Sequence, residues 1–336
     1  MAAQTCIEVI DQSQVGEARR AAVKAAQAAD MNDTRCGEVA IVATELATNL
    51  VRYAEHGRLL IQPLTTGSSV LVELLAIDSG PGIANISRCL SDGYSSGGTP
   101  GTGLGAVRRL SAEFDAYSTP GRGTVMMARL RASTPDIATR ARFSIGAVSV
   151  PAPGEVVCGD AWRLAEKGDE LAIMVADGLG HGPHAAEAAA RVSNAFAEDP
   201  FSGTDVFFQR AHHAAHGSRG AAVACCHINS LGEMRYSGVG NIAGTLMGLE
   251  SRRGLPTQNG TVGVEMRQAV AVAPYQWQER GLLVMHSDGL TSRWTLDTYP
   301  GLLVRHPAIV AGVLYRDFLR GRDDATVVVI GAAGTA

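Results

Sequence analysis

Aspartates that follow short apolar runs are the residues of this chain whose type and spacing could do chemistry. The run LAIMVAD ends in an aspartate followed by glycine, and LLVMHSD repeats the arrangement later in the chain. The acid positions of this kind are Asp160, Asp177, Asp288 and the pair Asp323–Asp324. The helix expected from about Pro183 starts too far from Asp177 for that carboxylate to be its N-cap. Any one of these acids is more often a turn residue, but together they predict one site for hard cations.

The chemistry of such a site follows from electrostatics. Carboxylates gathered in one cleft repel one another and raise one another's pKa values, and bound divalent cations remove that repulsion. Two ions about 3.5–4 Å apart can share a water and make it a nucleophile at neutral pH. The acids therefore predict in-line attack of water on a phosphate ester, with no covalent enzyme intermediate.

A second polar set lies in the first third of the chain. Glu45 and Asn49 are four residues apart in the helical segment 37–57, so their side chains stack on one face. They flank an apolar stripe expected at Val39, Val42, Leu46, Leu50 and Tyr53. Read alone, the pair fits a solvated helix edge as well as a cleft.

Two glycine-rich segments follow this helix. The strand LLAID ends at Asp78, and Ser79-Gly80-Pro81-Gly82 follows it. Such an aspartate can accept a hydrogen bond from a ligand amine while the glycine backbone comes close. Gly101, Gly103 and Gly105 precede a helix expected to begin near 104–107, where bare amides can cradle phosphates. The spacing fits neither a dinucleotide fingerprint nor a P-loop.

The elements that position these residues predict two α+β domains. Residues 1–132 form the first domain, 133–142 a linker, and 143–332 a second domain of β-branched strands with helices between them. The net charge of −4 gives no reason to expect nucleic acid or an anionic membrane as a partner. No run is long and apolar enough to span a bilayer, and no signal peptide is recognised. Six cysteines without C-x-x-C spacing predict reduced thiols and a cytoplasmic location.

The order E-x-x-x-N, D-x-G-x-G, G-x-G-x-G and a late Gly-Thr resembles the GHKL ATP-binding fold. TELATNLVRYA and GTGLGAVRRLSAEFDAYSTPGRGT look like the RsbT-type serine/threonine kinases. The resemblance implies a sandwich with helices on one face of a mixed sheet. It implies ATP and Mg²⁺ as cofactors. The implied roles are Asn49 for Mg²⁺, Glu45 as catalytic base, Asp78 for the adenine amine, Gly80 and Gly82 for the base pocket, Gly101, Gly103 and Gly105 for the lid, and Thr124 as support for Asp78.

CGD, VADGLGHGPHAAEAA, HSDGL and DDATVVVI resemble the SpoIIE/RsbX branch of the metal-dependent (PPM) protein phosphatases. The resemblance implies an αββα sandwich with two Mn²⁺ or Mg²⁺ ions. The implied metal ligands are Asp160, Asp177, the Gly178 carbonyl, Asp288 and Asp323, with Asp324 as the alternative to Asp323. Arg142 is a weak candidate for the arginine that grips phosphate in eukaryotic relatives.

The histidines are assigned no catalytic role. His181 is disfavoured as a ligand because hard cations prefer oxygen. His212, His213 and His216 have helical spacing that could suit Zn²⁺, but no acid or cysteine stands close in sequence, so a surface helix is favoured.

These resemblances predict a bifunctional partner-switching regulator. It would phosphorylate and dephosphorylate serine or threonine of a STAS-domain protein and so control a sigma factor or another output. The alternative is a phosphatase whose first domain only binds ATP and a partner, as an anti-sigma-like module. No nucleic acid or membrane partner is expected, and a homodimer is left open.

Overall fold

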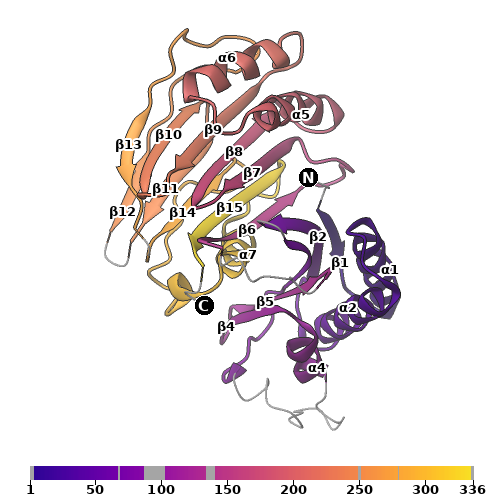
Figure 1. Cartoon of the computed structure of the whole chain (residues 1–336). Helices are drawn as coiled ribbons and strands as arrows, with labels where there is room; N and C mark the ends of the chain where they lie inside the picture. The colour runs from indigo at the N-terminus through magenta and orange to yellow at the C-terminus, as the bar shows by residue number, and fades with distance from the viewer. Residues whose placement is uncertain are drawn as a thin grey trace. The chain divides into compact units, whose positions relative to one another are not determined.

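A computed structural model describes residues 4–66, 69–86, 103–133, 141–248, 251–278 and 280–333. These form two compact units, coloured along the chain in Figure 1. The first unit comprises residues up to Arg140 together with Tyr299–Arg316, and the second comprises Ala141–Thr298 and Asp317–Thr335. The segment Tyr299–Arg316, called the excursion below, therefore interrupts the second unit, whereas the sequence places all of 143–332 in one domain.

Two long helices of the first unit are fixed by capping and by an apolar stripe. In α1 (Gln12–Ala28) the Asp11 side chain and Gln14 form a capping box. In α2 (Asp33–Tyr53) the Asn32 side chain accepts from the amide of Arg35. The stripe expected on α2 is buried except at Tyr53, which is 51% exposed. The prediction was wrong there because Tyr53 is the last helical residue, at the point where the helix leaves the core.

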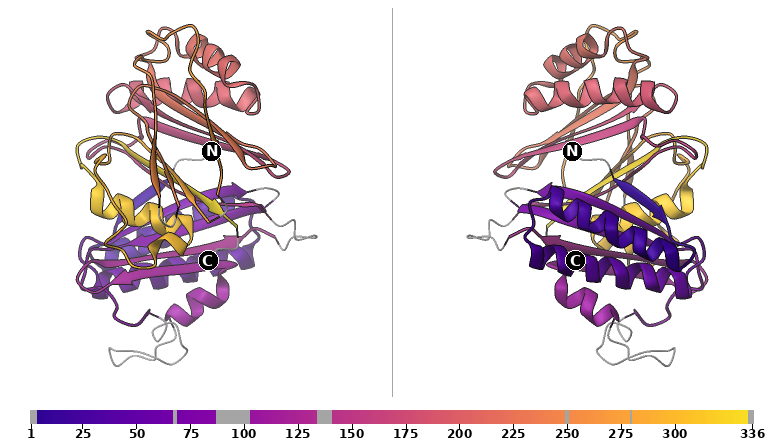
Figure 2. Two further views of the ribbon diagram at one scale, coloured as in Figure 1. Left: turned by 90° about the vertical axis from the view of Figure 1, so that its left-hand side faces the viewer. Right: turned by 90° about the vertical axis from the view of Figure 1, so that its right-hand side faces the viewer.

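These helices and α4 (Gly103–Leu110) pack on one face of a five-stranded sheet. The strands are β1 (Thr5–Glu8), β2 (Arg58–Thr66), β3 (Ser69–Ile77), β4 (Glu113–Thr119) and β5 (Gly123–Arg131), in the order β1-β2-β3-β5-β4. Figure 2 shows α1 and α2 side by side across that face. Every strand pair described in this sheet is antiparallel. Within these residues the sheet is therefore antiparallel, whereas a mixed sheet was expected. The hairpins β2–β3 and β4–β5 account for two of these antiparallel pairs.

The opposite face of this sheet carries a buried polar row. Arg129 Nε donates to Glu73 Oε2 at 2.8 Å, and Gln62 Nε2 donates to Glu73 Oε1 at 2.8 Å. The side chains of Arg129 and Glu73 are only 3% and 1% exposed. Because the two charges are paired and hydrogen-bonded, their burial is tolerated.

The excursion packs on the same face within the first unit. It contains a 3-10 turn, η1 (Leu302–Val304), and most of α7 (Pro307–Phe318). A Cβ added at Gly312 would lie 2.7 Å from Val125 and 3.4 Å from Leu75. Leu74 and Ala76 belong to the core under α1 and α2, so Leu75 faces the other way. The excursion thus covers the face that the other helices leave free.

The second unit contains two antiparallel sheets. Their strands are β6 (Phe143–Val150), β7 (Asp160–Lys167), β8 (Glu170–Gly178), β9 (Ala221–Ile228), β10 (Glu233–Val239), β11 (Ala243–Met247), β12 (Arg252–Leu255), β13 (Ala273–Gln276), β14 (Leu282–His286) and β15 (Ala325–Ala332). The orders are β13-β10-β9-β8-β7 and β12-β11-β14-β15-β6. Helices α5 (Pro183–Glu198) and α6 (Thr204–Ala215) cover the outer face of the first of these sheets, as Figure 1 shows.

Two smaller findings concern cysteines and membranes. Cys6, Cys36, Cys158, Cys225 and Cys226 are unpaired thiols, and Cys89 lies outside the described residues. Among the described helices, none is both long and apolar enough to cross a membrane.

Replacing Arg129 with methionine should destabilise the protein strongly. The substitution leaves the Glu73 carboxylate buried without its cation, and the loss of one partner of a buried pair costs about 3–5 kcal/mol. Arg131→Met is the control, because Arg131 is 37% exposed and lies 3.6 Å from Glu113; it should cost at most about 1 kcal/mol. Urea unfolding of both variants checks this, and equal losses would contradict it.

Candidate active sites

Of the two polar residues predicted on α2, Glu45 lies at the start of α4. Glu45 and Asn49 are half-buried beside the buried stripe. The Asn49 amide nitrogen is buried and has no hydrogen-bond partner among the described residues. A Cβ on Gly103, the first residue of α4, would come within contact of the Glu45 carboxylate. Glu45 therefore faces the N-terminus of α4, where free backbone amides favour an anion.

Asp78 directly follows β3 and is held by Gly80 and Thr124. The amide of Gly80 donates to its Oδ1 at 2.8 Å, and both the hydroxyl and the amide of Thr124 hydrogen-bond to Asp78. Burial raises the pKa of Asp78 and outweighs the lowering by these bonds and by Arg316. These bonds restrict the orientation of the carboxylate.

Glycine is required around Asp78 because backbone segments touch there. A Cβ on Gly123, where φ is +84°, would overlap the carbonyl of Asp78. A Cβ on Gly82, where φ is +71°, would overlap the carbonyl of Thr119. Gly80 would meet the Tyr53 carbonyl at 2.9 Å. The glycines predicted to shape the base pocket thus allow the β3 and β4–β5 turns to close on each other.

The predicted glycine lid is described only in part. Gly103 opens α4 and Gly105 is buried within its first turn. Gly101 lies outside the described residues. The two described glycines belong to the helix N-terminus rather than to the loop before it.

The acids of the second unit lie at two strand starts, those of β7 and β15, and at two strand ends, those of β8 and β14. Asp160 and Asp177 are direct partners in the β7–β8 ladder. Asp288 follows β14, and Asn241 Nδ2 donates to its Oδ2 at 2.8 Å. Asp324 is 2% exposed, and its Oδ1 accepts from the Ala152 amide at 2.9 Å. Asp177 plays no part in capping α5, whose N-cap is Gly182 with no side-chain bond.

The charges of these acids act on one another. Burial first and neighbouring carboxylates second raise the pKa of Asp160 and of Asp177 well above the usual range. Burial and then Asp323 raise the pKa of Asp288. Asp323 is the acid whose charge acts on all three of these residues. The side chains thus lie close enough to repel one another.

The glycines beside the acids allow close backbone approach. A Cβ on Gly178 would overlap the carbonyl of Ala185 in the first turn of α5, and one on Gly289 would overlap the carbonyl of Asp324. A Cβ on Gly159 would overlap the Asp324 carboxylate. Any larger residue at these positions would push the strand ends apart.

The fit of these acids to divalent cations rests on their chemistry. The donors are carboxylate oxygens, which hard cations prefer, and Asp324 Oδ2 is buried without a partner in the described part of the chain. Within the described residues no three or more His, Cys, Asp or Glu side chains are close enough together to enclose an ion as they stand. The acids therefore suit a cation cluster in type and charge, while enclosing an ion requires movement of their side chains.

Arg142 is excluded as the phosphate-gripping residue. Its Nη1 donates to the carbonyls of Asp169 and Asn229 at 2.9 and 2.8 Å. Asp169 lies in the turn after β7, at the end of that strand opposite to Asp160. The two ends of β7 are separated by seven residue steps, which span about 23 Å, so Arg142 lies far from Asp160. Arg142 instead links the turn that contains Asp169 to the turn that contains Asn229.

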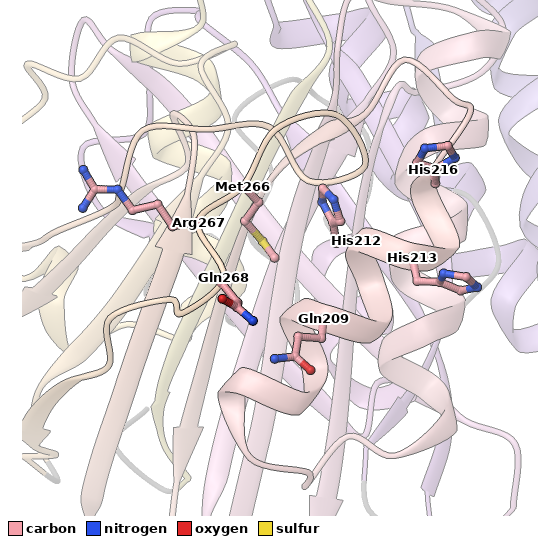
Figure 3. Close-up of a pocket in the computed structure, with 7 residues that line it drawn as sticks. All are labelled: Gln209, His212, His213, His216, Met266, Arg267 and Gln268. Atoms are coloured by element: carbon pink, nitrogen blue, oxygen red, sulfur yellow. The ribbon is translucent and has the colours of Figure 1, made fainter.

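The histidines lie outside the acid cluster. His181 Nδ1 lies 2.6 Å from Glu155 Oε1. His212 Nδ1 accepts from the Gly263 amide at 3.0 Å and so anchors the segment beside α6. A pocket of about 460 Å³ is lined by Gln209, His212, His213, His216, Met266, Arg267 and Gln268. In Figure 3 the three imidazole rings point in different directions, which does not fit a Zn²⁺ site.

Four residues of these sites were not singled out from the sequence. Ser287 Oγ donates to Asp160 Oδ2 at 2.6 Å, and Asn241 holds Asp288. Ser118 Oγ lies 3.0 Å from the Thr124 hydroxyl, and Arg316 Nη1 donates to the Asp78 carbonyl at 3.4 Å. Ser287 could have been found, because it stands next to Asp288 at a strand end. Asn241 and Arg316 lie 47 and 238 positions along the chain from the groups that they hold, whereas Ser118 contacts Thr124 across the β4–β5 turn.

Comparison with known proteins agrees with two different units. Residues 10–129 match a family described as histidine kinase-like ATPase domain, and residues 167–332 match stage II sporulation protein E (SpoIIE). Serine/threonine-protein kinase RsbT of Bacillus subtilis (strain 168) is 30% identical over 115 residues, which are 34% of this chain and 86% of RsbT.

Two solved structures resemble parts of the chain. One, described as "The bacterial stressosome: a modular system that has been adapted to control secondary messenger signaling", is 26% identical with a TM-score of 0.53 and covers 56% of this chain and 99% of its own. The other, RsbX in complex with magnesium, is 19% identical with a TM-score of 0.49 and covers 60% and 98%.

Asp177→Asn should stabilise the protein in a chelator and abolish its stabilisation by Mn²⁺. Removing one charge relieves repulsion in the cluster, and a gain of about 1 kcal/mol raises Tm by about 2–4 °C for a unit of this size. The unchanged protein should gain about 2.7 kcal/mol from Mn²⁺ at 100 times Kd. Thermal unfolding measures both effects. Asp169→Asn, in an exposed turn, should retain the full Mn²⁺ effect; a D177N protein that retains it as well would contradict the assignment.

Proposed function

Because the chain belongs to the family of RsbT and histidine kinase-like ATPase domains over its first domain and carries a SpoIIE-type phosphatase domain after it, we propose that it adds and removes one phosphate mark on a STAS-domain protein. The first unit phosphorylates a serine or threonine of this partner, and the second removes the phosphate. The level of the mark then controls a sigma factor or another output. One chain thus contains both opposing activities of a partner-switching system.

The observation that carries this proposal is the pairing of two complete polar sets on one chain. In the first unit, Glu45 faces the start of α4, the buried Asn49 amide has no partner among the described residues, and Asp78 is held by Gly80 and Thr124. In the second, Asp160 and Asp177 stand opposite each other in one ladder. A scaffold protein has no need of buried, mutually repelling carboxylates.

In the kinase reaction the residues of the first unit position ATP and the acceptor. Asp78 accepts from the adenine amine, and the amides at the start of α4 meet the phosphates. Glu45 takes the proton of the attacking hydroxyl, and Asn49, whose amide has no protein partner among the described residues, holds Mg²⁺. When bound, Mg²⁺ neutralises phosphate charge. Phosphoryl transfer depends mainly on such positioning and charge compensation.

In the phosphatase reaction Asp160, Asp177, Asp288 and Asp323 with the Gly178 carbonyl hold two divalent cations. Bound cations supply a water of lowered pKa as nucleophile. Ser287, directly after β14, donates to Asp160 Oδ2 and so restricts the orientation of the carboxylate that stands opposite Asp177 in the ladder. Asp324, pinned by the Ala152 amide, serves as a structural support, and Asp323 as a ligand.

Glu45→Gln should reduce transfer of label from ATP to a STAS-domain protein of the same genome by about 10²–10⁴-fold, because proton abstraction is lost. Radiolabelled ATP and gel autoradiography measure it. Glu38→Gln on the same helix is the control and should transfer label normally. Unchanged transfer by E45Q would leave the alternative, a first unit that only binds ATP and a partner; absence of transfer by the unchanged protein would remove the kinase activity from the proposal.

Ser287→Ala should lower the Mn²⁺-dependent release of phosphate from the labelled partner by about 10–100-fold, because the orientation of a metal ligand is lost. The measurement is a chase with Mn²⁺ after the labelling step. Ser202→Ala is a suitable control, because the Ser202 hydroxyl donates to the backbone carbonyl of Asp199 in the turn between α5 and α6. Full activity of S287A would contradict the arrangement, and no release by the unchanged protein would remove the phosphatase activity.

A further inference from the structure

The excursion leaves and re-enters the second unit at a short stem beside the candidate metal site. In this stem Gly289–Thr291 pairs with Phe318–Arg320. The Arg320 amide donates to the Gly289 carbonyl at 2.8 Å, and the Thr291 amide donates to the Phe318 carbonyl at 2.9 Å. The stem starts directly after Asp288 and ends at Arg320, shortly before Asp323. Movement of the excursion therefore reaches two proposed metal ligands through very few backbone bonds.

The N-terminal half of the excursion is bound to the edge strand β4 by charged hydrogen bonds. Both carboxylate oxygens of Asp115 are used: the His306 amide donates to Oδ2 at 2.8 Å, and Arg305 Nη1 donates to Oδ1 at 3.2 Å. His306 in turn caps α7, since its Nδ1 accepts from the Ala308 amide at 3.1 Å. Asp115 is 9% exposed, so these bonds are largely shielded from water.

The two ends of the excursion contact the turns that form the proposed nucleotide pocket. Arg316 Nη1 donates to the carbonyl of Asp78 at 3.4 Å. The Tyr299 ring lies 5.0 Å from the guanidinium of Arg122, in the turn directly before Gly123 and Thr124. Asp78 and Thr124 are the residues assigned to adenine recognition. A ligand that moves either turn therefore moves an end of the excursion.

The middle of the excursion cannot absorb such a movement locally. All residues from Pro307 to Tyr315 are buried. Gly312 packs so closely on β5 and β3 that a methyl group would lie 2.7 Å from Val125. Close-packed helices shift as units, because local deformation would open cavities. The excursion and the sheet of the first unit thus behave as one body.

We propose that nucleotide binding in the first unit regulates the phosphatase site of the second through the excursion. The inference rests on the proposed function, since it gives the same ATP site a second, regulatory role. The coupling is reciprocal: whatever factor the nucleotide imposes on metal affinity, the metal imposes on nucleotide affinity. ATP level then sets the balance between the two activities on the shared partner.

Tryptophan fluorescence offers a direct test, because Trp162, Trp277 and Trp294 all lie in the second unit. Trp294 is buried, and its Nε1 donates to His286 two residues before Asp288. A non-hydrolysable ATP analogue added to the full chain should change the emission of Trp294, and Trp294→Phe should remove most of this change. Hydrolysis of p-nitrophenyl phosphate should also be measured with free Mn²⁺ buffered at a limiting concentration. Under these conditions the analogue should change the rate of hydrolysis by about fivefold or more.

Two variants separate coupling from folding and from binding. Asp115→Ala removes the attachment of Arg305 and His306, and Gly312→Val forces α7 away from β5; neither residue belongs to the proposed nucleotide or metal site. Both should still bind the analogue by calorimetry and hydrolyse the aryl phosphate, while the analogue's effect on hydrolysis falls below about twofold.

Each outcome decides between the two proposals. If the unchanged protein binds the analogue and hydrolyses the aryl phosphate without any effect of one on the other, regulation is overturned while the two activities stand. If no analogue binds, the ATP site and its regulatory role both fall. If coupling persists in both variants, the excursion is not its path and the inference is wrong.

Discussion

The burial of negative charge is the constraint on which both units depend. In the first unit, Glu73 is buried together with Arg129, and each oxygen of its carboxylate accepts a hydrogen bond. In the second unit, Asp160 is also buried and accepts a hydrogen bond from the neutral hydroxyl of Ser287. The first arrangement is complete within the protein. The second is a set of carboxylates that repel one another and that bound cations would compensate, and this difference separates a structural network from a candidate reactive site.

Much of the candidate chemistry could be predicted because strand ends and glycines leave a local signature. Asp177 and Asp288 each follow an apolar strand and precede a glycine, and the contacts of Gly178 and Gly289 explain that spacing by backbone approach. Helix α2, with its N-cap and its apolar stripe, could also be predicted, apart from the exposure of Tyr53 at its end. These features depend on residues that are close together in the sequence, so they can be predicted from one sequence alone.

Other features depend on long-range packing and could not be predicted. Arg142 stands before a strand, and only the positions of two distant carbonyls show that it ties turns together. The antiparallel arrangement of the first sheet depends on the direction in which the chain re-enters the sheet after each connecting segment. Nothing local in residues 299–316 indicates which unit they join, since an apolar helix fits either. Their position is decided by Asp115, Arg58 and Asp78, far earlier in the chain.

The excursion also means that the chain cannot be divided by a single cut. A fragment beginning after the linker would carry α7, with nine consecutive buried residues, away from the sheet on which it packs. A fragment ending at the linker would expose the apolar and ionic face around Leu75 and Arg129. Dividing the chain at that point would therefore expose apolar surface on both fragments, and such surface promotes aggregation. A division that respects the packing would have to keep residues 299–316 with the first unit.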